Sequence, residues 1–112
     1  MQTCAGSPGP KHGALGTDAE RDLREIARYT LRQWGVRQQR RYASALEARF
    51  RAIAQRCIVP RPFSPAYPDV FVSHCEHHYI FYLHPEGQKP RILAVFHENM
   101  DLLARLAERL AP

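Results

Sequence analysis

"TDAERDLREIARYTLRQWG", residues 17–35, is the stretch that decides the fold class of this chain. Its apolar and small residues recur at spacings of three and four, which places them on one face of a helix. They are Ala19, Leu23, Ile26, Ala27, Thr30 and Trp34. Thr17 and Glu20 have the spacing of a capping box at the helix start, and Gly35 stands where a left-handed C-cap is expected. The pattern predicts a helix that begins at Thr17 and ends near Trp34.

A second amphipathic segment follows after a very short link. Its apolar residues step by four, four, three and four along the chain: Tyr42, Leu46, Phe50, Ile53 and Cys57. Because the link is so short, the two helices must fold back on each other as an antiparallel hairpin. Between Ile26 and Cys57 there are eight arginines and a single acidic residue, Glu47. The outer face of the hairpin is therefore expected to concentrate the positive charge.

Four prolines between positions 60 and 68 mark the end of the helical region. Because proline lacks the backbone donor that a helix interior or a central strand requires, this segment is predicted to be an extended connector. Strand-like runs rich in β-branched and aromatic residues follow at 70–72, 78–83 and 91–96. Their short connections predict an antiparallel meander. The last run is apolar without alternation, which indicates a central strand covered on both faces.

The chain ends in a short helical pattern that completes the fold. Asn99 is the expected N-cap, and Asp101 lies in the first turn, where it complements the helix dipole. The apolar side consists of Leu103, Leu106 and Leu110. We predict an α+β fold, with an N-terminal antiparallel helical hairpin packed on a small antiparallel three- to four-stranded sheet and a short C-terminal helix. Residues 1–16, rich in glycine and proline, are expected to be a flexible leader or a weak edge strand, and residues 17–112 a single domain.

The net charge of +5 comes almost wholly from arginine, with fourteen Arg against two Lys. Arginine presents planar, bidentate donors that suit carboxylates and phosphates, so the charge indicates either a nucleic acid or an acidic protein segment as partner. No apolar run approaches the ~20 residues that span a bilayer, and the N-terminus lacks the pattern of a secretory signal. We therefore expect a cytoplasmic protein that does not bind membranes.

The segment "HCEHHYIFYLH", residues 74–84, contains four histidines and a cysteine and raises the question of a metal site. Tetrahedral zinc sites usually use two ligand pairs at set spacings, and no second pair stands elsewhere in the chain. Neighbouring residues of a strand point to opposite faces, so His77 and His78 do not easily reach the same ion. The segment is interpreted as a strand, and no metal or other cofactor is predicted.

Four segments of the sequence resemble one protein family and occur in the order that the family has. They are "AERDLREIARYTLRQWG" (19–35), "YASALEARFRAIA" (42–54), "HHYIFYL" (77–83) and "ILAVFHENMDLLARL" (92–106). Together they resemble the ParE branch of the RelE/ParE superfamily, the small toxins of bacterial type II toxin–antitoxin pairs. The resemblance implies a cognate antitoxin whose extended segment covers the toxin. For the ParE branch it implies inhibition of DNA gyrase, and for the RelE branch it implies ribosome-dependent cleavage of mRNA.

The choice of branch depends on whether a nuclease centre is present. Cleaving RNA requires a base for the 2′-hydroxyl, an acid for the leaving oxygen and cations for the phosphate. RelE-type enzymes resemble one another in carrying basic and aromatic residues near the C-terminus, whereas this chain ends "LAERLAP". His97 and Arg91 are the candidates under a nuclease interpretation. The other interpretation of His97 is a structural one, in which it holds the strand-to-helix turn through a backbone hydrogen bond.

The candidate partner-binding residues are Trp34, Arg37, Arg40 and Arg41. Trp34 is either a core anchor at the hairpin tip or an exposed aromatic anchor for a partner. The three arginines either form a solvated face or attract the acidic residues of an antitoxin or the gyrase–DNA complex. Met100 is expected in the core.

We predict a ParE-like toxin that acts by binding rather than by catalysis, without sequence-specific binding of DNA. Its partners would be a cognate antitoxin and DNA gyrase. The alternatives are a ribosome-dependent endoribonuclease and a decayed toxin that only binds its antitoxin. The decayed toxin is suggested by the glycine-rich "GPKHGALG" (9–16), where the family places a well-formed strand, and by "VFVSHC" (70–75), where family members often carry an arginine.

Overall fold

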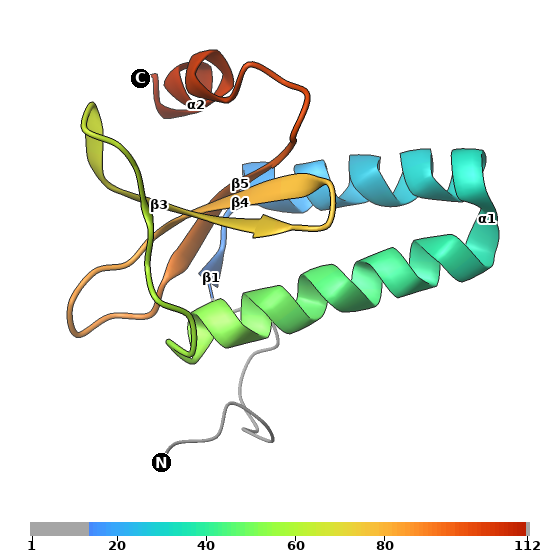
Figure 1. The fold of residues 1–112 in the computed structure, drawn as a ribbon, viewed down its shortest axis with the longest axis horizontal. Helices are drawn as coiled ribbons and strands as arrows, with labels where there is room; N and C mark the ends of the chain where they lie inside the picture. The colour runs from blue at the N-terminus through green and yellow to red at the C-terminus, as the bar shows by residue number, and fades with distance from the viewer. Residues whose placement is uncertain (1–13, 112) are drawn as a thin grey trace.

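The computed structural model describes residues 14–111, so most of the leader predicted for residues 1–16 lies outside the described residues. The elements, in chain order, are β1 (Ala14–Leu15), α1 (Thr17–Ala54), β2 (Pro62–Ser64), β3 (Tyr67–Cys75), β4 (His78–Leu83), β5 (Arg91–His97) and α2 (Leu102–Leu110). Figure 1 shows α1 bent into two long arms beside the sheet, with α2 apart from them. The predicted α+β class is confirmed. Within the described residues, neither helix has an apolar stretch long enough to cross a membrane.

The helical hairpin is formed by α1, which is broken at Gly35. This residue has φ 89° and ψ 177°, a combination that is essentially restricted to glycine because a Cβ atom makes it strained. A first arm, residues 17–34, and a second arm, residues 36–54, lie on either side of the break and run back along each other (Figure 1). The antiparallel hairpin predicted from the sequence is confirmed, with one glycine as its link.

Three local expectations about the helix ends were wrong. The N-cap of α1 is Gly16, which has no side chain that could cap the helix, and its amide donates to the carbonyl of Ile92 at 3.2 Å and ties the helix start to the sheet. The N-cap of α2 is Asp101, whose carboxylate accepts the Ala104 N–H at 3.2 Å, and Asn99 lies in the turn before it. Finally, α1 ends at Ala54, so Cys57 lies beyond the helix and is exposed.

The sheet has the strand order β1-β5-β4-β3-β2. Strands β2 to β5 are antiparallel to their neighbours, and β1 pairs parallel to β5 at the edge. The meander of three strands is confirmed, but the connector was not expected to contain β2. Pro62 is tolerated there because β2 is an edge strand and does not need every backbone donor.

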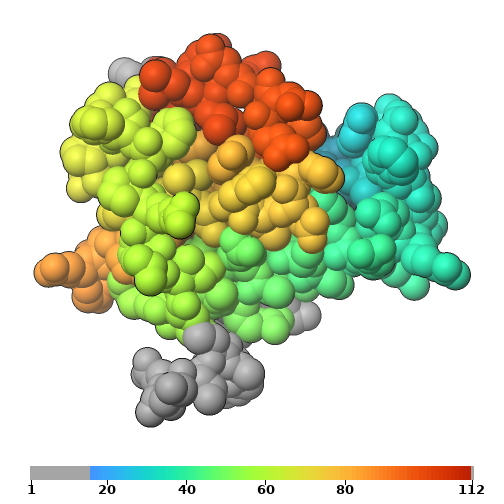
Figure 2. Space-filling view, viewed as in Figure 1, coloured from blue at the N-terminus to red at the C-terminus, as the bar shows by residue number. Residues whose placement is uncertain are grey.

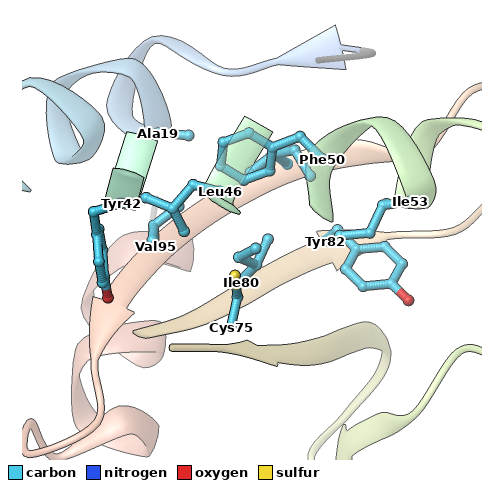
Figure 3. Packing of buried hydrophobic residues seen from close by; sticks show 10 residues of the cluster. Ala19, Tyr42, Leu46, Phe50, Ile53, Cys75, Ile80, Tyr82 and Val95 are labelled. Atoms are coloured by element: carbon cyan, nitrogen blue, oxygen red, sulfur yellow. The ribbon is translucent and has the colours of Figure 1, made fainter. Parts of the chain in front are cut away.

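Both faces of the sheet are covered, which confirms the central position predicted for β5. One cluster lies between α1 and the sheet, and Figure 3 shows Tyr42, Leu46 and Phe50 on the hairpin directed toward strand residues such as Ile80 and Val95. The second cluster lies on the opposite face, where Leu106 of α2 is fully buried. It consists of Val70, Phe81, Ala94, Phe96 and Leu106. The hairpin is therefore held on the sheet by its inner half, while its far end extends past the strands (Figure 1).

Candidate interaction surface

The hairpin tip, residues 31–41, projects beyond the sheet and is the segment around the turn of α1 at the right of Figures 1 and 2. Three large apolar side chains are exposed there: Leu31 by 46%, Trp34 by 69% and Val36 by 53%. The interpretation of Trp34 as a core anchor is wrong, because the apolar stripe of the first arm runs on past the end of the sheet that would have covered it. Trp34 has the exposed position that the alternative interpretation required.

The three candidate arginines lie on the second arm, just after the glycine break. Arg37, Arg40 and Arg41 are exposed and line one open hollow, together with Ser44 and Glu76 among others. Within residues 14–111, no hydrogen bond or ion pair engages any of the three guanidinium groups. The structure therefore places all four predicted partner-binding residues on the hairpin tip, and leaves their charged groups available to a partner.

A groove runs between the two arms of α1, and we call it the arm groove. Its empty volume is about 650 Å³, and its lining is mostly apolar. The lining residues are Leu23, Arg24, Ile26, Ala27, Thr30, Gln39, Tyr42, Ala43, Leu46, Glu47 and Phe50. Such a groove fits the apolar side of a helix or an extended segment. No single segment of the sequence predicted this groove, because its lining residues come from both arms.

Two of the four histidines of residues 74–84 lie at the turn between β3 and β4 and contact Glu98. His74 and His77 each lie 3.1 Å from one oxygen of Glu98, on the opposite chain segment. These two hydrogen bonds lower the pKa of Glu98 below its ordinary value. Within the described part of the chain, no group of three or more His, Cys, Asp or Glu side chains is arranged to hold a metal ion.

A short hydrogen-bonded chain connects this turn to the hairpin. The backbone N–H of His77 donates to the Tyr42 hydroxyl at 3.0 Å, and that hydroxyl is also hydrogen-bonded to Nδ1 of His78. Since the Tyr42 hydroxyl accepts from the amide, it donates its own O–H to Nδ1 of His78, and that nitrogen accepts only when His78 is neutral. Burial, with the adjacent His97, lowers the pKa of His78 to about 4, and burial raises the pKa of Tyr42 to about 12. The second arm is thus fixed to the sheet through an uncharged histidine.

A cleft between the first arm, β5 and α2, which we call the C-terminal cleft, brings basic groups together in a way that the sequence did not predict. Its empty volume is about 1240 Å³. The lining includes Tyr29, His78, His97, Arg105 and Arg109. These groups are the types that a nuclease uses, so this cleft is the place where a catalytic centre would lie if the protein had one.

Most of the basic groups of the C-terminal cleft already have structural partners. His97 Nδ1 accepts the backbone N–H of Asn99 at 3.1 Å, which is the turn-holding role expected for it. Arg105 lies 3.7 Å from Glu108 on the same helix. The other nuclease candidate, Arg91, is at the opposite end of β5 from His97, about 20 Å away at the usual rise of a strand. The two sequence candidates therefore do not act on one substrate atom.

Arg109 is fully engaged in an ion pair that connects three elements. Its guanidinium donates to both carboxylate oxygens of Asp22, at 3.0 and 3.1 Å, and to the carbonyl of Leu93 at 3.0 Å. Asp22 also accepts the Val95 N–H at 3.0 Å. The hydrogen bonds with Asp22 raise the pKa of Arg109 above its ordinary value. Sequence reasoning missed this pair because its members are 87 positions apart.

The ion pair lies beside an irregularity of β5. The register with β4 pairs Phe81 with Ala94 and Tyr82 with Ile92, which leaves Leu93 as an extra residue, a β-bulge. Beyond the residues that β1 pairs with, the backbone groups of Leu93 and Val95 are satisfied by Arg109 and Asp22. Met100, which follows in the turn before α2, is 42% exposed rather than in the core, because the turn carries it over the edge of the sheet.

A two-armed helix over one face of a small antiparallel sheet, with a projecting basic tip, an apolar groove and a short C-terminal helix, is the fold of the RelE/ParE class of bacterial toxins. The family model described as the ParE toxin of type II toxin–antitoxin system, parDE, matches residues 15–102. The chain is also 44% identical over 99 residues to Toxin ParE of Escherichia coli, a match that covers 86% of this chain and 93% of the relative. The chain belongs to the ParE toxin family. It is the toxin component of a type II toxin–antitoxin system, and a cognate antitoxin is its partner.

Proposed function

We propose that this toxin arrests growth by inhibiting DNA gyrase, and that its antitoxin neutralises it by covering the helical hairpin. The observation that carries the proposal is the hairpin surface itself, which combines an apolar groove with exposed arginines and an exposed tryptophan. Exposed aromatic and arginine side chains dominate the energetics of protein interfaces. This function places the toxin in the cytoplasm, where gyrase acts on DNA.

The antitoxin has two kinds of surface available to it. Apolar residues of its extended or helical segment would fill the arm groove, while acidic residues would face the arginines of the hairpin. The outer sheet edge at β2 is a further place for an extended segment, although β2 has three residues and begins with Pro62. The arm groove is therefore the more favourable site, and the sheet edge is a second one.

Action by binding is supported by the state of the cleft residues. The Nδ1 lone pair of neutral His78 accepts from the Tyr42 hydroxyl, so its other nitrogen carries the proton, and Arg109 is paired with Asp22. A general base or a phosphate-binding cation has to be available when substrate arrives, and these two groups are not.

One alternative has a specific observation in its favour. The C-terminal cleft carries His97, whose Nε2 makes no hydrogen bond within the described residues, and the exposed Arg105. A ribosome-dependent endoribonuclease would use this cleft. Primer extension on mRNA from induced cells tests it, because cleavage within codons that is lost in His97→Ala or Arg105→Ala would establish the nuclease.

Growth arrest with induction of the DNA-damage response is the expected result of expressing the toxin alone, and co-expression of its antitoxin should restore growth. The arm groove gives a sharper test. Ala43→Arg places a long charged side chain in the groove and should weaken antitoxin binding at least about tenfold, since it removes apolar contact and buries a charge. The toxicity of this variant should persist when the antitoxin is present. The measurement is growth, with binding of the purified pair followed by calorimetry.

Ala48→Arg is the matched control, because Ala48 is exposed on the same arm outside the groove. It should be toxic alone and rescued as fully as the original protein. Equal rescue of both variants, at equal melting temperatures, would exclude the arm groove as the antitoxin site. Co-purification with the antitoxin but no toxicity of the original chain would identify a decayed toxin instead.

A further inference from the structure

The hairpin tip is a positively charged surface. It projects past the sheet (Figures 1 and 2), and its guanidinium groups make no ion pair within residues 14–111. Glu76, on the turn between β3 and β4, is the one acidic side chain that lines the same hollow. Three positive charges face it, so the tip keeps a net positive charge.

The spacing of the arginines fits a phosphate backbone. Position 37 is one helical turn before positions 40 and 41, so the three share one side of the second arm. All three line the same hollow. From the first to the last they span about 6 Å along the helix axis at the usual rise of 1.5 Å per residue. A strand of DNA carries a phosphate about every 3.4 Å of its axis, so this span faces two successive phosphates. Arginine adds bidentate hydrogen bonds to phosphate oxygens.

Trp34 lies immediately before the glycine break and is the most exposed aromatic side chain among the described residues. The exposed indole of Trp34 is unfavourable for the isolated protein, since it leaves a large apolar surface in contact with water. Aromatic side chains beside a positively charged surface are the usual stacking platform for unpaired bases in proteins that bind single-stranded nucleic acid.

We propose that the hairpin tip, through Arg37, Arg40, Arg41 and Trp34, is a sequence-independent DNA-binding site. The arginines hold the sugar–phosphate backbone, and the indole stacks on an unpaired base. This inference rests on the proposed function, because it identifies the DNA that gyrase holds as a direct partner of the toxin. It deepens that function: the toxin would contact the nucleic acid as well as the enzyme.

An acidic protein segment fits the tip less well than DNA does. A peptide needs a groove that removes its apolar side chains from water, and the apolar groove lies between the arms, whereas the hollow at the tip is open and lined mostly by charged and polar side chains. The tip offers charge and an aromatic face, which match a phosphate backbone and a base.

The test uses Trp34 as its own reporter, because it is the single tryptophan of the chain. Titration of the full-length toxin with a single-stranded oligonucleotide should quench its fluorescence with micromolar affinity at low salt, and binding should weaken roughly 7-fold between 50 and 200 mM salt if two phosphates are contacted. Duplex DNA should bind through its phosphates alone and should quench the tryptophan fluorescence less. Trp34→Leu, followed by anisotropy of labelled DNA, should bind the single strand at least about fivefold more weakly.

The decisive comparison is between two triple variants of equal net charge. Arg37→Gln, Arg40→Gln and Arg41→Gln should remove most of the salt dependence and of the affinity. The control combines Arg21→Gln, Arg51→Gln and Arg61→Gln, which are exposed and distant from the tip. It should bind DNA nearly as well as the original chain. Equal loss in both triple variants would show that only the overall charge matters and would overturn the proposal.

Gyrase assays separate this proposal from the proposed function. If the toxin inhibits gyrase, binds no DNA by fluorescence, and yet loses inhibition in the tip variant, the tip contacts protein and the DNA proposal is wrong. If the toxin binds DNA through the tip but does not inhibit gyrase, the proposed function fails while the DNA site stands.

Discussion

Replacing Asp22 with alanine should lower the free energy of unfolding by about 3 kcal/mol, because it leaves the charge of Arg109 partly buried and unpaired. The Asp22 side chain is 12% exposed and that of Arg109 is 20% exposed, so solvent compensates for the loss only in part. The same change also removes the acceptor of the Val95 N–H. Chemical denaturation followed by circular dichroism measures the difference.

This substitution should also loosen α2, since the helix is held on the sheet mainly by the burial of Leu106 and by the ion pair of Arg109. Faster amide hydrogen exchange in α2 than in β4 would show it. Asp18→Ala is the control, because Asp18 is 53% exposed and its pairs are long, so the expected change is within about 0.5 kcal/mol. Equal stabilities of the Asp22 and Asp18 variants would refute the structural role of the ion pair.

The stability of the toxin should fall by about 2 kcal/mol between pH 7 and pH 4.5 because of His78. Its pKa is about 4 in the folded protein, against an ordinary value of 6.5, so the unfolded chain takes up the proton first as the pH falls. The stabilising contribution is complete above the unfolded pKa and is lost as the pH falls from 6.5 toward 4. The figure allows for partial exposure of the ring to solvent.

His78→Gln should remove most of this pH dependence, while its amide oxygen still accepts the hydrogen bond from Tyr42. Glu98 does not affect this pH range. Its pKa is lowered in the folded protein, so its contribution to stability is lost only as the pH falls below its ordinary value of 4.5. The measurement is urea denaturation of both proteins across the range. A variant that loses as much stability as the original chain between pH 7 and pH 4.5 would show that another group is responsible.

Periodicity of apolar residues predicted the main elements, because helices and buried strands impose regular spacings on the sequence. The hairpin followed from two apolar stripes and the glycine between them, and β5 followed from its unbroken apolar run. The strand β2 could not be predicted in this way. Its proline argues against a strand in general, and only the tertiary position of β2 at the sheet edge makes it acceptable.

The sequence analysis named the residues of the candidate surface but did not establish that Trp34 is exposed. Trp34 continues the stripe of the first arm, and the sequence does not show that the sheet ends before it. The C-terminal cleft and the pair of Asp22 with Arg109 join segments that are far apart in the chain, so neither left a local pattern. The exposed position of Met100 likewise depends on the path of the turn before α2 rather than on its spacing.

We infer that this toxin acts through a binding surface on its helical hairpin and not through a catalytic centre. The most direct measurement adds purified toxin to DNA gyrase and relaxed plasmid, with and without the antitoxin, and follows supercoiling together with cleaved DNA. The account predicts that supercoiling is blocked, that cleaved DNA accumulates, and that the antitoxin reverses both effects, with His97→Ala as active as the original chain. Unimpaired supercoiling, together with cleavage of ribosome-bound mRNA that His97→Ala abolishes, would contradict it.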